Sequence, residues 1–236
     1  MSTSHIVSAF DKELTDIESL TLDMGGRVEV QILEAIQALD SRDEERAEKI
    51  VKADKKIDQL HVQIDENIIK LIALRQPKAV DLRFVMGASK VAASLERIGD
   101  YAKNIAKRTG VISQSPPIRE VTSTLKTISE LVQAMLKDVL DAYVKRDVAL
   151  AGNVRLRDEE VDHIYTTQFR SLLTHMIEDP RAITPCMHLM FVAKNLERIG
   201  DHITGIAEQV WFMVEGHYPE DERPKVDKTS YTSANE

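Results

Sequence analysis

The chain has a single cysteine, Cys186, in 236 residues, so it can form neither an internal disulfide nor a cysteine-based zinc knuckle. Nine glycines and seven prolines are too few for a turn-rich β-sandwich or barrel. No run of 18 apolar residues occurs, and the first residues lack the basic and apolar regions of a signal peptide. We therefore expect an intracellular protein with neither signal peptide nor transmembrane span.

An excess of basic residues is also missing, because 39 acidic residues outnumber 31 basic ones and the net charge is -8. A dedicated nucleic-acid-binding protein normally presents a basic field to phosphates, so this class is disfavoured. What the chain does contain is 43% hydrophobic residues, enough for a substantial core, and abundant Leu, Ile, Ala, Glu, Lys and Arg. That composition favours helix.

Apolar residues recur at steps of three or four along six segments, the pattern of amphipathic helices. The segments are 10–39, 47–71, 78–108, 118–145, 148–177 and 184–215. A helix of thirty residues is about 45 Å long. Because the connections are short, we expect long antiparallel helices packed into bundles.

Glycine and proline mark the boundaries of these segments. Gly25-Gly26 predicts a kink or close packing in the first helix, with a break into two helices as the alternative. Pro77 predicts a turn, and Gly110 stands where a C-cap belongs. We divide the chain into a first bundle (1–112), a linker (113–117), a second bundle (118–216) and a disordered tail (217–236).

The two halves of the chain are copies of one unit. Leu95–Asp100 and Leu196–Asp201 are both Leu-Glu-Arg-Ile-Gly-Asp, at a shift of 101 residues. Asp54 and Asp58 match Asp158 and Asp162 at a shift of 104 residues. A six-residue identity in register with the rest indicates a duplicated three-helix unit. The predicted fold is all-α, with two tandem three-helix bundles made of six long antiparallel helices.

Four pairs of carboxylates are spaced four residues apart, which places both members on one face of a helix. They are Glu96 with Asp100, Glu197 with Asp201, Asp54 with Asp58, and Asp158 with Asp162. Paired anions repel unless a cation lies between them, and such oxygen ligands suit a metal ion. A solvated charged face, or neutralisation of the carboxylates by Arg97 and Arg198, would explain the same pattern without metal.

Histidine adds little to a metal site. Asp58 and His61 are three residues apart, and Glu160 with His163 forms one Glu-x-x-His, an element that di-iron bundles use twice. A surface or ion-paired histidine is the simpler interpretation. The sequence has no Walker loop, dinucleotide fingerprint or serine-hydrolase elbow, so we expect no enzymatic activity.

The segment Arg75–Arg83, the two Leu-Glu-Arg-Ile-Gly-Asp copies and Asn104-Ile105-Ala106 strongly resemble the PhoU family, accessory proteins of the phosphate-specific transport system. The resemblance implies two three-helix bundles and iron or zinc on the Glu/Asp-x-x-x-Asp motifs. Its candidate ligands are Glu96, Asp100, Glu197 and Asp201, with Asp54, Asp58, Asp158 and Asp162 facing them. The second copy departs from the pattern, because Thr184-Pro185-Cys186 stands where the first has Asp81-Leu82-Arg83.

The same resemblance implies regulation. A family member of this kind represses the phosphate regulon when phosphate is plentiful, and links the phosphate ABC transporter to a sensor histidine kinase and its response regulator. We expect a cytoplasmic homodimer that reaches the inner face of the membrane through these partners. A carboxylate-bridged metal-binding or di-iron bundle is the alternative function, and a plain structural or dimerisation module is a third.

Overall fold

The computed structural model describes residues 3–221, and the regular structure in this part of the chain is helical throughout. The helices are α1 (Thr3–Ser41), α2 (Glu44–Ala53), α3 (Lys55–Arg75), α4 (Val80–Ile112), α5 (Arg119–Lys145), α6 (Val148–Glu178) and α7 (Ile183–Glu215), with a 3-10 turn, η1 (Pro180–Ala182). Asp54, between α2 and α3, keeps right-handed helical dihedral angles (φ -53°, ψ -34°). The two helices therefore form one long helical segment of the bundle. We call each such segment a leg, and the described part of the chain has six legs.

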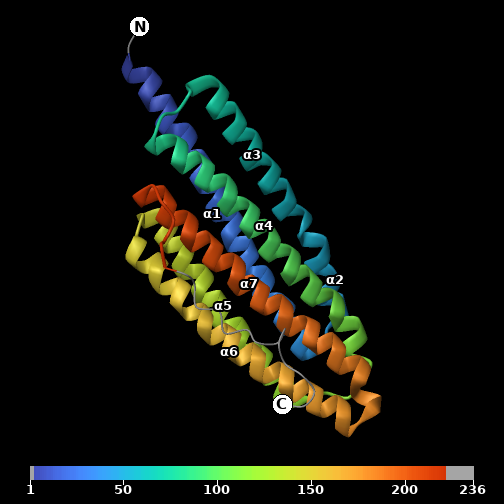
Figure 1. Cartoon of the computed structure of the whole chain (residues 1–236). Helices are drawn as coiled ribbons and strands as arrows, with labels where there is room; N and C mark the ends of the chain where they lie inside the picture. The colour runs from blue at the N-terminus through green and yellow to red at the C-terminus, as the bar shows by residue number, and fades with distance from the viewer. Residues whose placement is uncertain (1–2, 222–236) are drawn as a thin grey trace.

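The legs group into two three-helix units, one for each copy of the repeat. Helices α1, α2–α3 and α4 form the first unit, and α5, α6 and α7 form the second. Figure 1 shows α2 and α3 at one outer edge of the molecule and α6 at the other. The predicted fold class, two tandem three-helix bundles, is confirmed.

The two units meet along α4 and α7, which lie side by side in Figure 1. The helices are antiparallel, because Gly87 near the start of α4 approaches Met213 near the end of α7, whereas Arg108 approaches His188. Buried apolar residues from both units form one continuous core. The last helix of each repeat, which carries the Leu-Glu-Arg-Ile-Gly-Asp motif, is thus central to the molecule.

The turn that joins the first two legs is built in the same way in both copies. Asp43 accepts a hydrogen bond from Arg46 N (2.9 Å), and its repeat equivalent Asp147 accepts one from Leu150 N (2.9 Å), so each aspartate is an N-cap. The preceding residues, Arg42 and Arg146, adopt left-handed dihedral angles (φ 58° and 56°). An Arg-Asp pair therefore ends one helix and begins the next in each copy.

The structure confirms the expectation at one glycine and differs from it at Gly110 and within the predicted 47–71 helix. Helix α1 runs unbroken through Gly25, where a Cβ would lie 2.7 Å from Leu140 Cδ1, so close packing against α5 is confirmed. Gly110 is not the C-cap, because α4 continues to Ile112, which is buried. The predicted 47–71 helix is interrupted at Asp54.

The linker and the start of the tail contact the helices. Arg42 Nη1 donates to Ser115 O (2.7 Å), which fixes the linker to the end of α1. Within the predicted tail, the Tyr218 ring stacks on Phe212 at 4.9 Å and its hydroxyl accepts from Lys90 Nζ (2.8 Å). Residues 222–236 of the predicted tail lie outside the described residues. No helix among residues 3–221 combines the length and apolar content needed to cross a membrane.

Candidate functional site

In the first unit, a lysine joins two of the predicted ligands. Lys103 Nζ lies 2.5 Å from Asp54 Oδ2 and 2.5 Å from Asp100 Oδ1. The second oxygen of Asp54 accepts a hydrogen bond from Gln31 Nε2 (3.0 Å). Asp54 is 3% exposed, so its charge is buried and engaged by both α1 and α4.

The electrostatics of this cluster follow from that contact. Burial opposes the charge on Lys103, but its hydrogen bonds to Asp100 and Asp54 outweigh burial and raise the pKa of Lys103. Glu96 differs: burial, and then the neighbouring Asp100, raise the pKa of the Glu96 carboxyl, and Asp58 adds to this effect. Four predicted ligands therefore lie near one another at α4, and the Lys103 ammonium group already lies between two of them. The four are Asp54, Asp58, Glu96 and Asp100.

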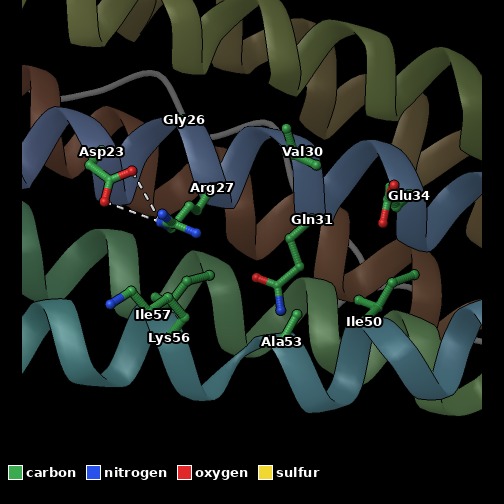
Figure 2. A pocket seen from close by; sticks show the side chains of 10 residues that line it. All are labelled: Asp23, Gly26, Arg27, Val30, Gln31, Glu34, Ile50, Ala53, Lys56 and Ile57. Carbon is green, nitrogen blue, oxygen red and sulfur yellow. Dashed lines mark hydrogen bonds and ion pairs between the residues drawn. The ribbon is translucent and has the colours of Figure 1, made fainter.

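Gln31, the partner of Asp54, also lines a pocket of about 460 Å³ between α1 and the α2–α3 leg. Figure 2 shows Gln31 reaching from α1 toward the opposite leg, while Asp23 and Arg27 pair on α1 at one side (3.1 Å). The lining residues are Asp23, Gly26, Arg27, Val30, Gln31, Glu34, Ile50, Ala53, Lys56 and Ile57. Gln31 therefore connects the pocket with the buried carboxylate of Asp54.

In the second unit the carboxylates are more deeply buried. Asp158, Asp162 and Glu197 are 1%, 2% and 5% exposed, and Asp201 is half-buried. Glu197 Oε1 lies 2.8 Å from Lys194 Nζ, and this lysine also lies over the Tyr165 ring at 5.0 Å. A lysine is therefore paired with a predicted ligand in this unit as well.

The lysines that pair with the carboxylates stand at different positions in the two repeats. Thr204 stands where the first copy has Lys103, and Lys194 stands where the first copy has Ala93. Thr204 donates its hydroxyl to the backbone oxygen of Asp201 (2.7 Å). The carboxylate pattern is duplicated, but the neutralising lysine approaches from a different position in each copy.

These arrangements bear on whether iron or zinc fits. In the first unit the Lys103 ammonium occupies the position between Asp54 and Asp100 that a metal ion would take. Among residues 3–221, no group of three or more His, Cys, Asp or Glu side chains is arranged to hold a metal ion. The described side chains therefore do not fit a metal as they stand, and the eight-carboxylate metal site stays a prediction.

The histidine and arginine side chains considered as partners of the carboxylates lie at longer distances or on the surface. Glu160 and His163 are both exposed on α6 rather than directed into the bundle, unlike the ligands of a di-iron centre. His61 Nε2 lies 3.5 Å from Asp65 Oδ2. Arg97 lies 3.6 Å from Glu96 and 3.7 Å from Asp100, beyond hydrogen-bond distance, so the close cation for Asp100 is Lys103 instead.

Sequence reasoning missed Lys103 and Gln31. Lys103 follows Asp100 by three residues, a spacing that signals a helical ion pair, and it is replaced by Thr204 in an otherwise faithful repeat. Its second partner, Asp54, is 49 residues away and gives no local signal. Gln31 has no signal in the sequence, because it meets Asp54 only after α1 packs against the α2–α3 leg.

A tandem pair of three-helix units, with an acidic pair on the last helix of each, defines a class of duplicated all-α proteins. A family model described as the PhoU domain matches the chain twice, over residues 21–109 and 125–210, in agreement with the duplication. The chain belongs to the PhoU family.

Individual relatives match over nearly their whole length. A protein of Rhizobium meliloti (strain 1021), named phosphate-specific transport system accessory protein PhoU homolog, is 48% identical over 98% of this chain and 97% of its own. A protein of the same name from Caulobacter vibrioides (strain NA1000 / CB15N) is 46% identical over 97% and 99%.

Solved structures match the fold over most of the chain. The crystal structure of PhoU from Pseudomonas aeruginosa has a TM-score of 0.85 and 39% identity, covering 88% of this chain and all of that one. The phosphate transport system regulatory protein PhoU from Streptococcus pneumoniae has a TM-score of 0.82 and 28% identity, covering 89% and 99%.

Proposed function

We propose that this chain is a negative regulator of the phosphate regulon and of phosphate uptake. It acts as a cytoplasmic adaptor that links the phosphate ABC transporter to the sensor histidine kinase when phosphate is plentiful. The observation that carries the proposal is the near full-length similarity to accessory proteins of the phosphate-specific transport system. An adaptor needs surfaces rather than catalytic groups, and long helical faces supply such surfaces.

The repressor role is tested in cells that lack the chain. In phosphate-rich medium, alkaline phosphatase activity is expected to be high in these cells and to fall when the wild-type chain is restored. An empty vector serves as the control, and immunoblotting verifies equal amounts of the restored chain. Activity that stays low in both strains, or stays high after restoration, contradicts the repressor role.

The partners are tested separately. A tagged chain is used to capture proteins from detergent-solubilised membranes of phosphate-replete cells, with the tag alone as the control. Recovery of both the phosphate transporter and the sensor kinase is expected. Recovery of the transporter alone would limit the role to uptake, and recovery of neither would overturn the adaptor proposal.

The proposal includes a homodimer, which the outer face of α3 supports. Val62 and Ile69 are seven residues apart on α3, and they are 57% and 67% exposed. Two apolar side chains on one exposed helical face gain free energy when a second subunit covers them. Sedimentation velocity is expected to show a dimer for the wild type and a monomer for Val62→Glu with Ile69→Glu. Leu156→Glu on α6, which changes a residue that is 61% exposed, is the matched control and should stay dimeric.

A further inference from the structure

The last helices of the two repeats, α4 and α7, are antiparallel, so the two ends of their contact are equivalent in the repeat (Figure 1). At one end the chain turns back after α7, where Gly216 has left-handed dihedral angles (φ 85°). This turn brings Tyr218 into contact with both α4 and α7. A side chain from outside the two helices therefore covers this end.

Tyr218 contacts three residues there. Its ring stacks on Phe212, with centroids 4.9 Å apart and an interplanar angle of 10°. Its hydroxyl accepts a hydrogen bond from Lys90 Nζ (2.8 Å) and donates one to Gln209 Oε1 (3.1 Å). We call Lys90, Gln209 and Phe212 the covered end, and it is a binding site for a tyrosine side chain of the chain itself.

The repeat places the same three positions at the other end of the α4–α7 contact. The shift of 101 residues relates Lys90 to Phe191, Gln209 to Arg108, and Phe212 to Val111. The Arg108 guanidinium carbon lies 4.3 Å from the centroid of the Phe191 ring. Phe191 is 47% exposed and Val111 is 37% exposed. We call Arg108, Val111 and Phe191 the exposed end, because an aromatic ring and its apolar neighbour lie open to solvent there.

The chain that follows α4 is held elsewhere. Arg42 Nη1, at the end of α1, donates to Ser115 O (2.7 Å), and the Ser113 hydroxyl donates to Glu44 Oε1 of α2 (2.5 Å). The linker is therefore fixed to α1 and α2 instead of turning back over α4 and α7. This difference between the linker and the tail explains why only one of the two equivalent ends is covered.

The charge of the exposed end indicates which partner it favours. Neither residues 101–112 of α4 nor residues 183–195 of α7 include an aspartate or glutamate, although the chain has 39. Within the described part of the chain, Arg108 contacts the His188 ring nitrogen (3.2 Å) and the Phe191 ring, and no carboxylate pairs with it. A guanidinium group without a counter-ion favours a carboxylate, to which it can donate two parallel hydrogen bonds.

We propose that the exposed end is a docking site for a tyrosine side chain on an acidic segment of a partner protein. The ring packs on Phe191 as Tyr218 packs on Phe212, and a neighbouring carboxylate pairs with Arg108. The occupant belongs to a different protein, because a copy of this chain already holds its own Tyr218 at the covered end. The inference rests on the adaptor role proposed above, and it identifies a surface and a partner chemistry for that role.

The probe is a peptide with the sequence of residues 217–221, His-Tyr-Pro-Glu-Asp, in which two carboxylates follow the tyrosine. NMR of the full wild-type chain is expected to show saturable shifts of the Arg108, Val111 and Phe191 signals, which requires no substitution in the protein. Shifts confined to the covered end would overturn the proposal, because the peptide would then only replace Tyr218. The absence of saturable shifts would overturn it as well.

Changes in the peptide test the two parts of the recognition separately. A peptide with Tyr218→Ala lacks the ring, and one with Glu220→Gln and Asp221→Asn lacks the carboxylates. Each should bind at least about fivefold more weakly than the unchanged peptide, through loss of the aromatic contact or of the ion pair. Equal binding of all three peptides would contradict the proposed chemistry.

Changes in the protein locate the site. Phe191→Ala and Arg108→Gln should each weaken binding of the unchanged peptide at least about fivefold. Leu156→Ala and Arg170→Gln, which change an exposed apolar residue and an exposed arginine of α6, are the matched controls and should bind as the wild type does. Equal binding by the wild type and both exposed-end variants overturns the proposal. Peptide binding by the purified chain reports on this site alone, whereas capture from membranes reports on the adaptor role, so the two failures are distinguishable.

Discussion

Lys103 Nζ of α4 lies 2.5 Å from Asp54 Oδ2 at the bend between α2 and α3, so one ammonium group ties the central helix to the outer leg. Asp54 cannot be left alone at this place, because a buried carboxylate without a counter-ion is strongly destabilising. Gln31 completes the set from α1. All three legs of the first unit therefore meet at one carboxylate.

Replacing Lys103 by methionine keeps the length of the side chain and removes its charge. The expected result is a loss of about 3 kcal/mol in the free energy of unfolding, the lower end of the range for breaking a buried ion pair. Urea denaturation measures it. Lys107→Met, one turn further along the exposed side of α4, is the control and should change stability by no more than about 0.5 kcal/mol. Equal stability of the two variants would show that Asp54 does not depend on Lys103.

Divalent cations are expected to substitute for the missing ammonium group in Lys103→Met. Without Lys103, the carboxylates of Asp54 and Asp100 face each other without the cation that now joins them, and oxygen ligands of this kind favour a metal ion. Thermal unfolding with and without Mn²⁺ or Zn²⁺ should show a rise in Tm for the variant that exceeds the rise for the wild type. An identical response of both proteins would count against a latent metal site in the first unit.

Much of the fold could be predicted from the sequence, because it depends on local periodicity. Apolar spacing indicated the legs, and the two Leu-Glu-Arg-Ile-Gly-Asp copies indicated two equivalent units. Gly110 misled because the cost of a glycine in a helix, about 1 kcal/mol, is smaller than the gain from burying Ile112 beyond it.

The candidate site was less predictable, because its chemistry depends on contacts between legs. The family resemblance implied that Asp54 faces the motif containing Asp100, but a metal ion and a lysine satisfy the same two carboxylates. Only the packing of α4 against the bend at Asp54 distinguishes them. Gln31 likewise became part of the site through the packing of α1, which periodicity does not specify residue by residue.

The free energy of unfolding is expected to depend on pH through His188, which lies where α7 contacts α4. Burial, and then the adjacent Arg108, lower the pKa of His188 from its ordinary value of 6.5, and Arg108 Nη1 lies 3.2 Å from His188 Nδ1. Protonation is thus harder in the folded state than in the unfolded one. The stabilising contribution is present above the unfolded pKa and is lost as the pH falls through the folded pKa.

His188→Gln removes this titration while leaving an oxygen that can accept from Arg108. Between pH 7 and pH 5, the wild type should lose more unfolding free energy than the variant does, as measured by urea denaturation at each pH. His163→Gln, which changes an exposed histidine on α6, should follow the wild-type profile. Parallel curves for the wild type and His188→Gln would contradict the assignment.

Two glycines of α7 should respond in opposite directions to alanine. A Cβ on Gly200 would lie 2.5 Å from Oδ1 of the buried Asp158, so Gly200→Ala is expected to cost about 1–3 kcal/mol through overpacking. A Cβ on Gly205 would meet nothing within 4 Å, so Gly205→Ala should stabilise the helix by about 0.5–1 kcal/mol. Urea denaturation of both variants gives the comparison. Equal stability of Gly200→Ala and Gly205→Ala would contradict this prediction. It would mean that the Asp158 carboxylate can turn away from the new methyl group. The close contact between α6 and α7 would then not be the reason for a glycine at position 200.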